Sequence, residues 1–179
     1  MTRAVAWSVT LADHVAMPFP VTASLDGASP VGIGHTDLAP ECRDRVRAAL
    51  VNSGQLWPET RVRLSSAEVP QPAGIADLAV AVSVQALSGE FRSIPLAKIM
   101  FVAELGLDGS LRSVEGIWAA FDAAAPLGLT HAVVPRAQLS EFGASTGITV
   151  LGARTLNAVL AWLRGTRALP CAGTHHWDM

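Results

Sequence analysis

The chain has 179 residues, of which 50% are hydrophobic and 16% are charged, and its formal net charge is −2. This composition fits one folded domain, excludes an intrinsically disordered chain, and argues against a protein that binds nucleic acid mainly through charge. No apolar run is long enough to span a membrane and no signal peptide is recognisable, so we expect a cytoplasmic protein that does not enter membranes.

The front of the chain predicts β-strands. Apolar residues alternate with smaller or polar residues from Val5 to Leu11 and again from Phe19 to Leu25, which is the pattern of half-buried strands. Shorter strands are expected over residues 31–35 and 61–64, where β-branched and apolar residues are separated by glycine or charged residues.

The first helix is predicted over residues 38–52. Asp37 is a favourable N-cap, Pro40 falls in the first turn, where it removes no intrahelical hydrogen bond, and Gly54 follows the last turn. The apolar stripe of this helix consists of Leu38, Cys42, Val46 and Leu50.

Strands and helices alternate in the second half of the chain. A helix over 77–87 is apolar almost all round and is therefore expected to be buried, and further helices are expected over 116–127 and 155–164. Thr155 is the expected cap of the last one, and Asp108–Gly109 predicts a tight two-residue hairpin turn. The strands expected here are 99–107, 111–114, 130–134 and 148–151.

Together these elements predict an α/β (α+β) fold, a mixed-sheet two-layer sandwich that forms one domain over residues 1–164. Residues 165–179 show no periodicity, and we expect them to form a loosely ordered C-terminal tail.

Several collinear segments carry a family resemblance. The segment from Gly34 reads GHTDLAPECRDRVRAALVNSGQLWP, and the segment from Phe101 reads FVAELGLDGSLRSVEGI. Both resemble the N-terminal, ChlI-type domain of the magnesium-chelatase-like ComM/YifB family. Between them, LSSAEVPQPAGIADLAVAV stands in the place of a third family segment, and the later stretches VVPRAQLSEF and VLGARTLNAVLAWL match in kind and order. The resemblance covers about residues 3–164.

The resemblance implies a ribosomal protein S5 domain 2-like fold, which is shared with the Lon protease domain. It also implies an AAA+ ATPase module after this domain, in a hexameric DNA motor linked to natural transformation. The chain ends about where that module would begin. It contains no G-x-x-x-x-G-K-[ST] motif, and its single lysine, Lys98, does not follow a glycine-rich loop. We therefore expect neither ATP hydrolysis nor a bound cofactor.

A Lon-like hydrolase would need a serine nucleophile and a lysine base within hydrogen-bonding reach. By resemblance to Lon-type domains, Trp118 stands where the lysine belongs, and residues 72–74, where the nucleophile would lie, contain no serine. An indole cannot act as a general base, so we expect no catalytic residues in this chain. The alternative is a degenerate Lon-fold hydrolase or a nucleotide-binding ATPase subunit.

Two arginines of the first predicted helix are candidates for contacts with a partner. Arg43 and Arg47 share one helix face, because residues four positions apart lie on the same side. This face is either a solvated surface with local ion pairs, a subunit contact or a contact with DNA phosphates.

The loop before the buried helix supplies the other candidates. Gln71 and Gly74 lie in a loop that has lost the lysine of the family pattern, and the loop over 70–76 is our first candidate for an exposed apolar patch. Asp77 matches the family pattern and is either an N-cap of the buried helix or a functional carboxylate.

Cysteine and histidine positions do not indicate a metal centre. Cys171, His175, His176 and Asp178 are close in sequence, but their spacing matches no tight zinc pattern. Cys42 lies on an apolar helix stripe and is expected to be a buried small hydrophobe.

We therefore expect a non-catalytic ChlI-like domain that acts as an assembly or binding module. Its partner would be a second copy of itself or an AAA+ ATPase, and the chain would be a partner or remnant of a ComM-type DNA motor. Direct DNA binding is expected to be weak or absent, because the arginine cluster of the first helix, Arg43, Arg45 and Arg47, is mixed with acidic residues and has no interleaved aromatic residues.

Overall fold

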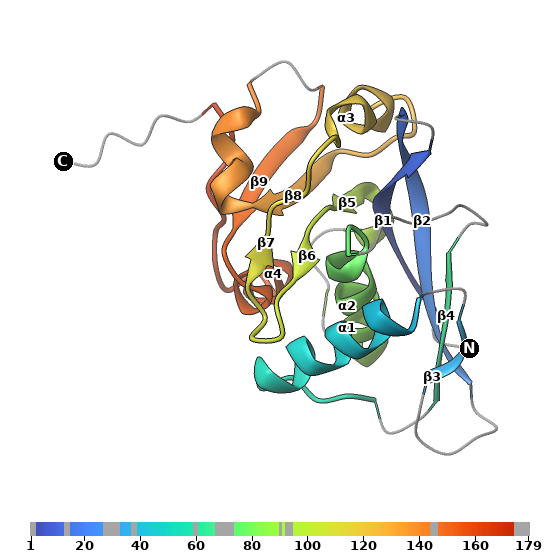
Figure 1. Cartoon of the computed structure of the whole chain (residues 1–179). Helices are drawn as coiled ribbons and strands as arrows, with labels where there is room; N and C mark the ends of the chain where they lie inside the picture. Colours follow the sequence, from blue (N-terminus) through green and yellow to red (C-terminus); the bar gives the residue numbers. More distant parts are fainter. Residues whose placement is uncertain are drawn as a thin grey trace.

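A mixed β-sheet of seven strands runs through the part of the chain that the structure describes (Figure 1). The structure is a computed structural model, and it describes residues 3–12, 15–26, 33–36, 39–58, 61–66, 74–89, 91, 95–143 and 147–173. The strand order is β3-β4-β2-β1-β5-β8-β9. The strands are β1 (Arg3–Ala12), β2 (Val15–Asp26), β3 (Ile33–Thr36), β4 (Arg61–Ser66), β5 (Ile99–Phe101), β8 (His131–Pro135) and β9 (Thr149–Ala153).

The sheet is antiparallel in its middle and parallel at both ends, and at one end β3 pairs parallel with β4. β1 and β2 form a long antiparallel hairpin, and β4 pairs antiparallel with the outer side of β2. On the other side, β1 pairs parallel with β5, and β8 and β9 continue the parallel arrangement. The carboxyl ends of β5, β8 and β9 therefore lie along the same edge of the sheet.

Helices cover both faces of the parallel end formed by β5, β8 and β9. Ile99 and Phe101 of β5 point into a core that α1, α2 and α4 complete, whereas Met100 and Val102 point into a second core that contains α3 and the 3₁₀ helix η3. Successive side chains of a strand face opposite sides, so the two cores lie on opposite faces. The predicted α/β fold with a mixed sheet is confirmed, and α3 and η3 add a layer to the predicted two-layer arrangement. The helices are α1 (Pro40–Asn52), α2 (Asp77–Gln85), α3 (Trp118–Ala124), α4 (Leu156–Leu163) and η3 (Arg136–Glu141).

α2 is the central helix of the first core. All of its residues, from Asp77 to Gln85, are buried, and it contacts α1, β1 and β2. A helix without a polar stripe is the kind that can be surrounded in this way. The buried helix predicted over 77–87 is confirmed, and its last turn is the 3₁₀ helix η1 (Ala86–Ser88). None of the helices in the described segments is long and apolar enough to cross a lipid bilayer.

The strand predicted over 99–107 is two strands. β5 belongs to the large sheet, whereas β6 (Glu104–Leu105) pairs antiparallel with β7 (Leu111–Arg112) in a separate two-stranded sheet. The predicted hairpin is confirmed, but its loop is one residue longer than expected. The N–H of Gly106 donates to the carbonyl of Ser110 at 2.8 Å, which leaves three residues in the loop.

The start of α1 differs from its prediction, whereas the start of α4 agrees. α1 begins at Pro40, and Ala39 at its N-cap position offers no side-chain hydrogen bond. The predicted cap, Asp37, lies outside the described residues. The predicted cap of α4 is confirmed, because the Thr155 hydroxyl accepts a hydrogen bond from the N–H of Ala158 at 3.2 Å.

The chain after α4 follows the outer edge of β9, contrary to the loose tail expected from residue 165. The N–H of Gly152 donates to the carbonyl of Pro170, and the N–H of Ala172 donates to the carbonyl of Val150, each at 2.9 Å. An edge strand offers unpaired backbone groups, and this segment uses them. Residues 174–179 lie outside the described part of the chain.

Candidate functional site: the polar junction around Asp77

A fully buried carboxylate lies at the start of α2. The Oδ2 atom of Asp77 accepts hydrogen bonds from Nε of Arg45 at 2.8 Å and from the backbone N–H of Leu105 at 3.2 Å. Its Oδ1 atom accepts a third from Nη2 of Arg45 at 3.3 Å. The interpretation of Asp77 as an N-cap is wrong, because Ala76 holds that position and the Asp77 side chain is directed at other elements.

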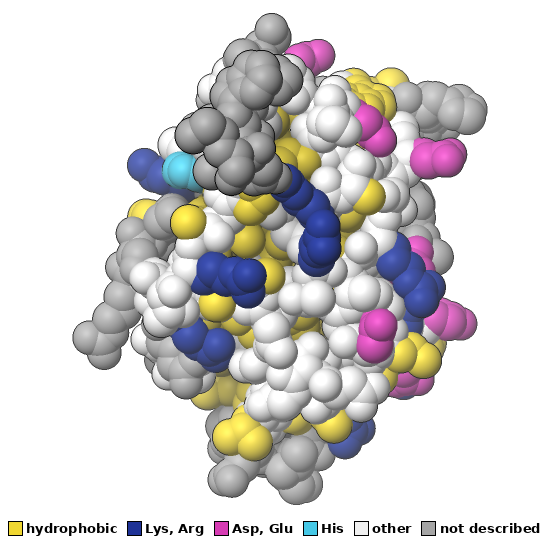
Figure 2. All heavy atoms as spheres, turned by 90° about the vertical axis from the view of Figure 1, so that its left-hand side faces the viewer, with side chains coloured by type: hydrophobic (Ala, Val, Ile, Leu, Met, Phe, Trp, Pro, Cys, Tyr) yellow, Lys and Arg dark blue, Asp and Glu magenta, His cyan; other side chains and the backbone are white. Residues whose placement is uncertain are grey.

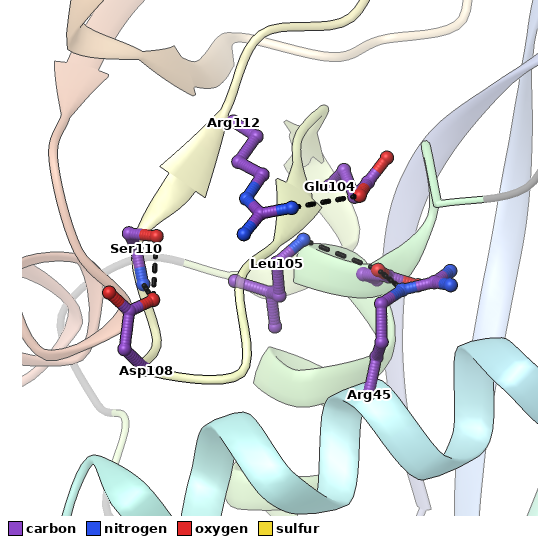
Figure 3. Close-up of polar contacts among 7 residues, drawn as sticks. Arg45, Glu104, Leu105, Asp108, Ser110 and Arg112 are labelled. Carbon is purple, nitrogen blue, oxygen red and sulfur yellow. Dashed lines mark hydrogen bonds and ion pairs between the residues drawn. The ribbon is translucent and has the colours of Figure 1, made fainter.

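Arg45 of α1 supplies the counter-charge. Its Nε and Nη2 both face the carboxylate, the two-point contact for which a planar guanidinium is suited. The hydrogen bond with Asp77 raises the pKa of Arg45 above its ordinary value, although partial burial acts in the opposite direction. Figure 3 shows the Arg45 side chain extending from α1 toward the backbone of Leu105 in β6. The ion pair therefore links α1 and α2 and, through Leu105, the small hairpin.

Cys42 lies next to this ion pair on α1. Burial raises the pKa of the Cys42 thiol far above its ordinary value, and the charge of Asp77 and a hydrogen bond with its carboxylate raise it further. The thiol is therefore protonated at neutral pH and is a poor nucleophile. The prediction that Cys42 is a buried small hydrophobe is confirmed.

The other side of the junction is formed by β6, β7 and the turn before α2. Glu104 lies opposite Arg112 across the β6–β7 pair, and their charged groups are 3.8 Å apart (Figure 3). Gly74 packs against Glu104: a Cβ added at Gly74 would lie 2.7 Å from Oε2 of Glu104. Gly74 also has φ +95°, a backbone conformation that other residues rarely adopt. The closely packed turn therefore requires glycine.

The loop between β6 and β7 is itself attached to two helices. The carbonyl of Leu107 accepts a hydrogen bond from Nδ2 of Asn52 in α1 at 2.7 Å. The carbonyl of Gly109 accepts one from the N–H of Leu156 in α4 at 2.8 Å. These bonds connect α1 and α4 through the hairpin loop.

Asp108 orders the same loop from within. Its Oδ1 atom accepts hydrogen bonds from the hydroxyl of Ser110 at 2.7 Å and from the N–H of Ser110 at 3.0 Å (Figure 3). These hydrogen bonds lower the pKa of Asp108 below its ordinary value. Asp108 therefore stabilises the conformation of the loop between β6 and β7.

The Asp77 junction, defined as Asp77 with Arg45, Cys42, Glu104 and Leu105, is a structural link. Arg45 and Leu105 donate three hydrogen bonds to the carboxylate, and Asp77 has no exposed surface through which a substrate could reach it. A buried pair of this kind fixes the relative positions of the elements that supply its members. The junction thus couples α1, α2 and the β6–β7 hairpin.

The predicted contact residues do not form one exposed surface in the described part of the structure. Arg43 pairs with the neighbouring Asp44 at 3.1 Å on the surface, and Arg47 is exposed, with no hydrogen bond or ion pair to any described residue. Gly74 is buried beside the junction, and Gln71 lies outside the described residues. Of the predicted residues that the structure describes, only Gly74 and Asp77 are brought together, and both lie inside the protein.

Sequence reasoning missed the role of Arg45 in this junction. It grouped Arg45 with the exposed arginines of the same helix. The available signal was its position between Cys42 and Val46, two members of the apolar stripe, which places the Arg45 side chain at the border of the buried face. A charged side chain at such a border commonly has a partner on the helix packed against it.

The described residues contain no group of three or more His, Cys, Asp and Glu side chains that could hold a metal ion. Cys171 is partly exposed beside β9. His175, His176 and Asp178 lie outside the described residues.

The segments that form the junction lie within the part of the chain that one family model matches. The family model described as "Subunit ChlI of Mg-chelatase" matches residues 21–138, and the chain belongs to that family. Within it, the relatives identify the chain as a domain of the magnesium-chelatase-like ComM/YifB kind.

Three relatives illustrate this relationship. An uncharacterised protein of Mycobacterium tuberculosis is 38% identical over 151 residues, which is 83% of this chain and 30% of the relative. YifB of Escherichia coli is 34% identical over 83% of this chain and 29% of its own length. The competence protein ComM of Haemophilus influenzae is 34% identical over 74% of this chain and 26% of its own length. The chain thus spans less than a third of these relatives.

Proposed function

We propose that this chain is a non-catalytic ChlI-like domain that works as an assembly or binding module together with an AAA+ motor of the ComM kind. The observation that carries the proposal is the environment of Trp118. By resemblance to Lon-type domains, this residue stands where a catalytic lysine would be needed. An indole there cannot take up a proton, whereas it can contribute a large apolar contact to a partner.

Trp118 occupies the first position of α3. Its ring lies 4.5 Å from the ring of Phe142, centroid to centroid, and 45% of its surface is exposed. Phe142 in turn contacts Phe121 in the second core. One side of the indole is therefore held by the protein while the other side faces outward. A rigid, half-exposed aromatic side chain is typical of an interface anchor, because little conformational entropy is lost on binding.

Trp118 is an exposed residue of a helix that lies against the sheet. α3 packs on β2, and Ala16 of β2 is part of the core beneath α3. Val15 and Met17, on either side of Ala16, are 53% and 47% exposed, but successive side chains of a strand alternate, so these two face the side of the sheet away from α3. We term the exposed side of Trp118, at the start of α3, the α3–β2 surface. This surface replaces the loop over 70–76 as our candidate, because the described end of that loop, Gly74 to Ala76, is buried.

The comparison with relatives supports a role as one domain among several. In relatives named YifB and ComM, the matching region is less than a third of the protein. The name of the Haemophilus relative associates that protein with competence. We extend this association to the present chain as part of the proposal, and we place the chain in the cytoplasm with such a motor.

Static light scattering across a wide concentration range, with and without a purified AAA+ module of ComM type, tests the proposal. We expect concentration-dependent self-association or a stable complex with the motor. In the same preparation we expect no hydrolysis of ATP, peptides or esters. Hydrolysis that is lost in Lys98→Ala would support the alternative of an ATPase or hydrolase, and a strictly monomeric chain that does not bind the motor would contradict the assembly role.

A further inference from the structure

Two arginines meet at the carboxyl ends of adjacent parallel strands. β8 ends at Pro135 and β9 ends at Ala153, and these two residues are directly paired in the sheet. Arg136 and Arg154 are the first residues after the two strands. Neighbouring strands are about 4.8 Å apart, so the backbones of the two arginines begin side by side. From this arrangement we propose that Arg136 and Arg154 form a binding site for phosphate groups.

Both side chains line one surface cavity. This cavity measures about 390 Å³ and is lined by Arg136, Arg154, Leu111 and Ala137. The carbonyl of Arg154 accepts a hydrogen bond from the N–H of Leu111 at 2.9 Å, which fixes the backbone of Arg154 against the β6–β7 hairpin. The cavity thus lies beyond the strand ends, beside the hairpin. The crevice outside the carboxyl ends of parallel strands is where α/β sheets commonly bind ligands.

The Arg136 side chain passes over a glycine on its way to the cavity. A Cβ added at Gly152 of β9 would lie 3.3 Å from Cδ of Arg136 and 2.8 Å from Cδ2 of Leu139. The absence of a side chain at Gly152 therefore leaves room for the stem of Arg136. Arg136 also lines a second cavity of about 450 Å³ that continues toward Phe142.

The two positive charges are not compensated within the described part of the protein. Neither Arg136 nor Arg154 forms an ion pair or a side-chain hydrogen bond with any described residue. By contrast, Arg45 and Arg112 each have a carboxylate partner. Two neighbouring cations repel each other, and an anion between them turns this repulsion into attraction.

The chemistry of the site favours phosphate. A guanidinium group presents several N–H donors in one plane and can hold two oxygen atoms of the same anion. Figure 2 shows the side of the molecule that carries β7, β8 and β9, with several Lys and Arg side chains across its middle and acidic side chains mainly along one margin. The phosphate could belong to a single-stranded nucleic-acid backbone or be free inorganic phosphate, because both present the same oxygen atoms.

Fluorescence anisotropy with a labelled single-stranded oligonucleotide, and calorimetric titration with inorganic phosphate, test the proposal on the full chain at low salt. Arg136→Gln and Arg154→Gln should each weaken binding about tenfold, since each removes a charged hydrogen-bonding partner. Lys98→Gln is the matched control, because Lys98 is an exposed cation that precedes β5, at the opposite end of the parallel strands. It should leave the affinity nearly unchanged. If two phosphates of the oligonucleotide are contacted, the logarithm of its affinity should fall with the logarithm of salt concentration with a slope of roughly −1.4.

The two titrations also distinguish the sources of the phosphate. Oligonucleotide binding without measurable binding of millimolar inorganic phosphate supports a nucleic-acid backbone, and the reverse result supports a free phosphate. In either case the arginine variants must lose affinity. The proposal is overturned if neither ligand binds, or if Lys98→Gln weakens binding as much as Arg136→Gln and Arg154→Gln do.

Discussion

Arg45 and Asp77 differ in how far each side chain reaches solvent. The side chain of Arg45 is 22% exposed, whereas that of Asp77 is completely buried. The two partners therefore differ in whether the remaining charge can reach water when the other partner is removed. An unpaired arginine at this position can turn toward water, but an unpaired carboxylate at position 77 cannot.

This asymmetry predicts unequal losses of stability. Arg45→Met leaves a buried carboxylate without a counter-charge, and we expect it to lower the free energy of unfolding by about 3–5 kcal/mol. Asp77→Asn keeps an acceptor for the N–H of Leu105, and we expect a loss of about 1–3 kcal/mol. Urea unfolding of both variants measures the difference. Arg43→Met is the control and should cost less than about 1 kcal/mol, because its ion pair is on the surface.

A double variant provides a further check on the same pair. Arg45→Met combined with Asp77→Leu removes both charges and should be more stable than Arg45→Met alone, because no buried charge remains unpaired. If Asp77→Asn destabilises the protein as strongly as Arg45→Met does, the different exposure of the two side chains does not determine the loss of stability.

The raised pKa of the Cys42 thiol should make the stability of the protein depend on pH. Its pKa in the folded protein lies above the ordinary value of 9.0 that applies to the unfolded chain. Above pH 9 the unfolded chain therefore loses this proton while the folded protein keeps it, so stability falls as pH rises. Relative to Cys42→Ala, the wild-type protein should lose up to about 1.4 kcal/mol for each pH unit above 9.

The measurement is the free energy of unfolding between pH 7 and pH 10.5. The difference between the wild-type protein and Cys42→Ala should be constant up to about pH 8 and then change in favour of the variant. Parallel curves over the whole range would show that Cys42 ionises equally in the folded and unfolded states.

At the scale of elements, the turn before α2 depends on Gly74. Gly74→Ala introduces a side chain where φ is +95° and where a Cβ would lie 2.7 Å from Glu104. The left-handed conformation alone costs roughly 1–2 kcal/mol for a residue with a side chain, and the contact with Glu104 should add to that. Gly128→Ala is the matched control, because Gly128 has φ +77° and open space around it.

Thermal or urea unfolding should therefore rank Gly74→Ala below Gly128→Ala in stability. Adding Glu104→Ala to Gly74→Ala should recover part of the difference, since it removes the atoms with which the new methyl group collides. If Gly74→Ala and Gly128→Ala are equally stable, the close packing of Gly74 against Glu104 has no energetic importance.

The elements themselves were largely predictable from local sequence patterns. The buried helix α2, the hairpin around Asp108 and the cap at Thr155 each follow from residues close together in the chain. The division of the predicted strand over 99–107 was not predictable in this way. Val102 still bonds to Val133 of β8, while Glu104 already pairs with Arg112, and this change of partner depends on the packing of distant segments.

The candidate site was less predictable than the fold for the same reason. Asp77 was singled out by its family pattern, but its partner Arg45 is 32 residues away and its third contact, Leu105, is 28 residues away. Helical periodicity places Arg45 at the border of a buried face without indicating what lies opposite. The pairing of Arg136 with Arg154 required the register of β8 and β9, which no local pattern specifies.

At the scale of the whole molecule, the proposed assembly role depends on the α3–β2 surface. Trp118→Ser removes the exposed ring that forms this surface while leaving the core beneath α3 in place. We expect the variant to fold and to lose self-association or motor binding by tenfold or more, as is typical of a central aromatic anchor. Leu56→Ser is the matched control, because Leu56 is 88% exposed and lies outside this surface.

Sedimentation velocity of the wild-type chain, Trp118→Ser and Leu56→Ser, each alone and mixed with a purified AAA+ module of ComM type, tests the proposed function most directly. We expect a larger species for the wild-type chain and for Leu56→Ser, and a monomer for Trp118→Ser. A wild-type chain that stays monomeric in both conditions, or a Trp118→Ser variant that associates as strongly as the wild type, would contradict the proposed function.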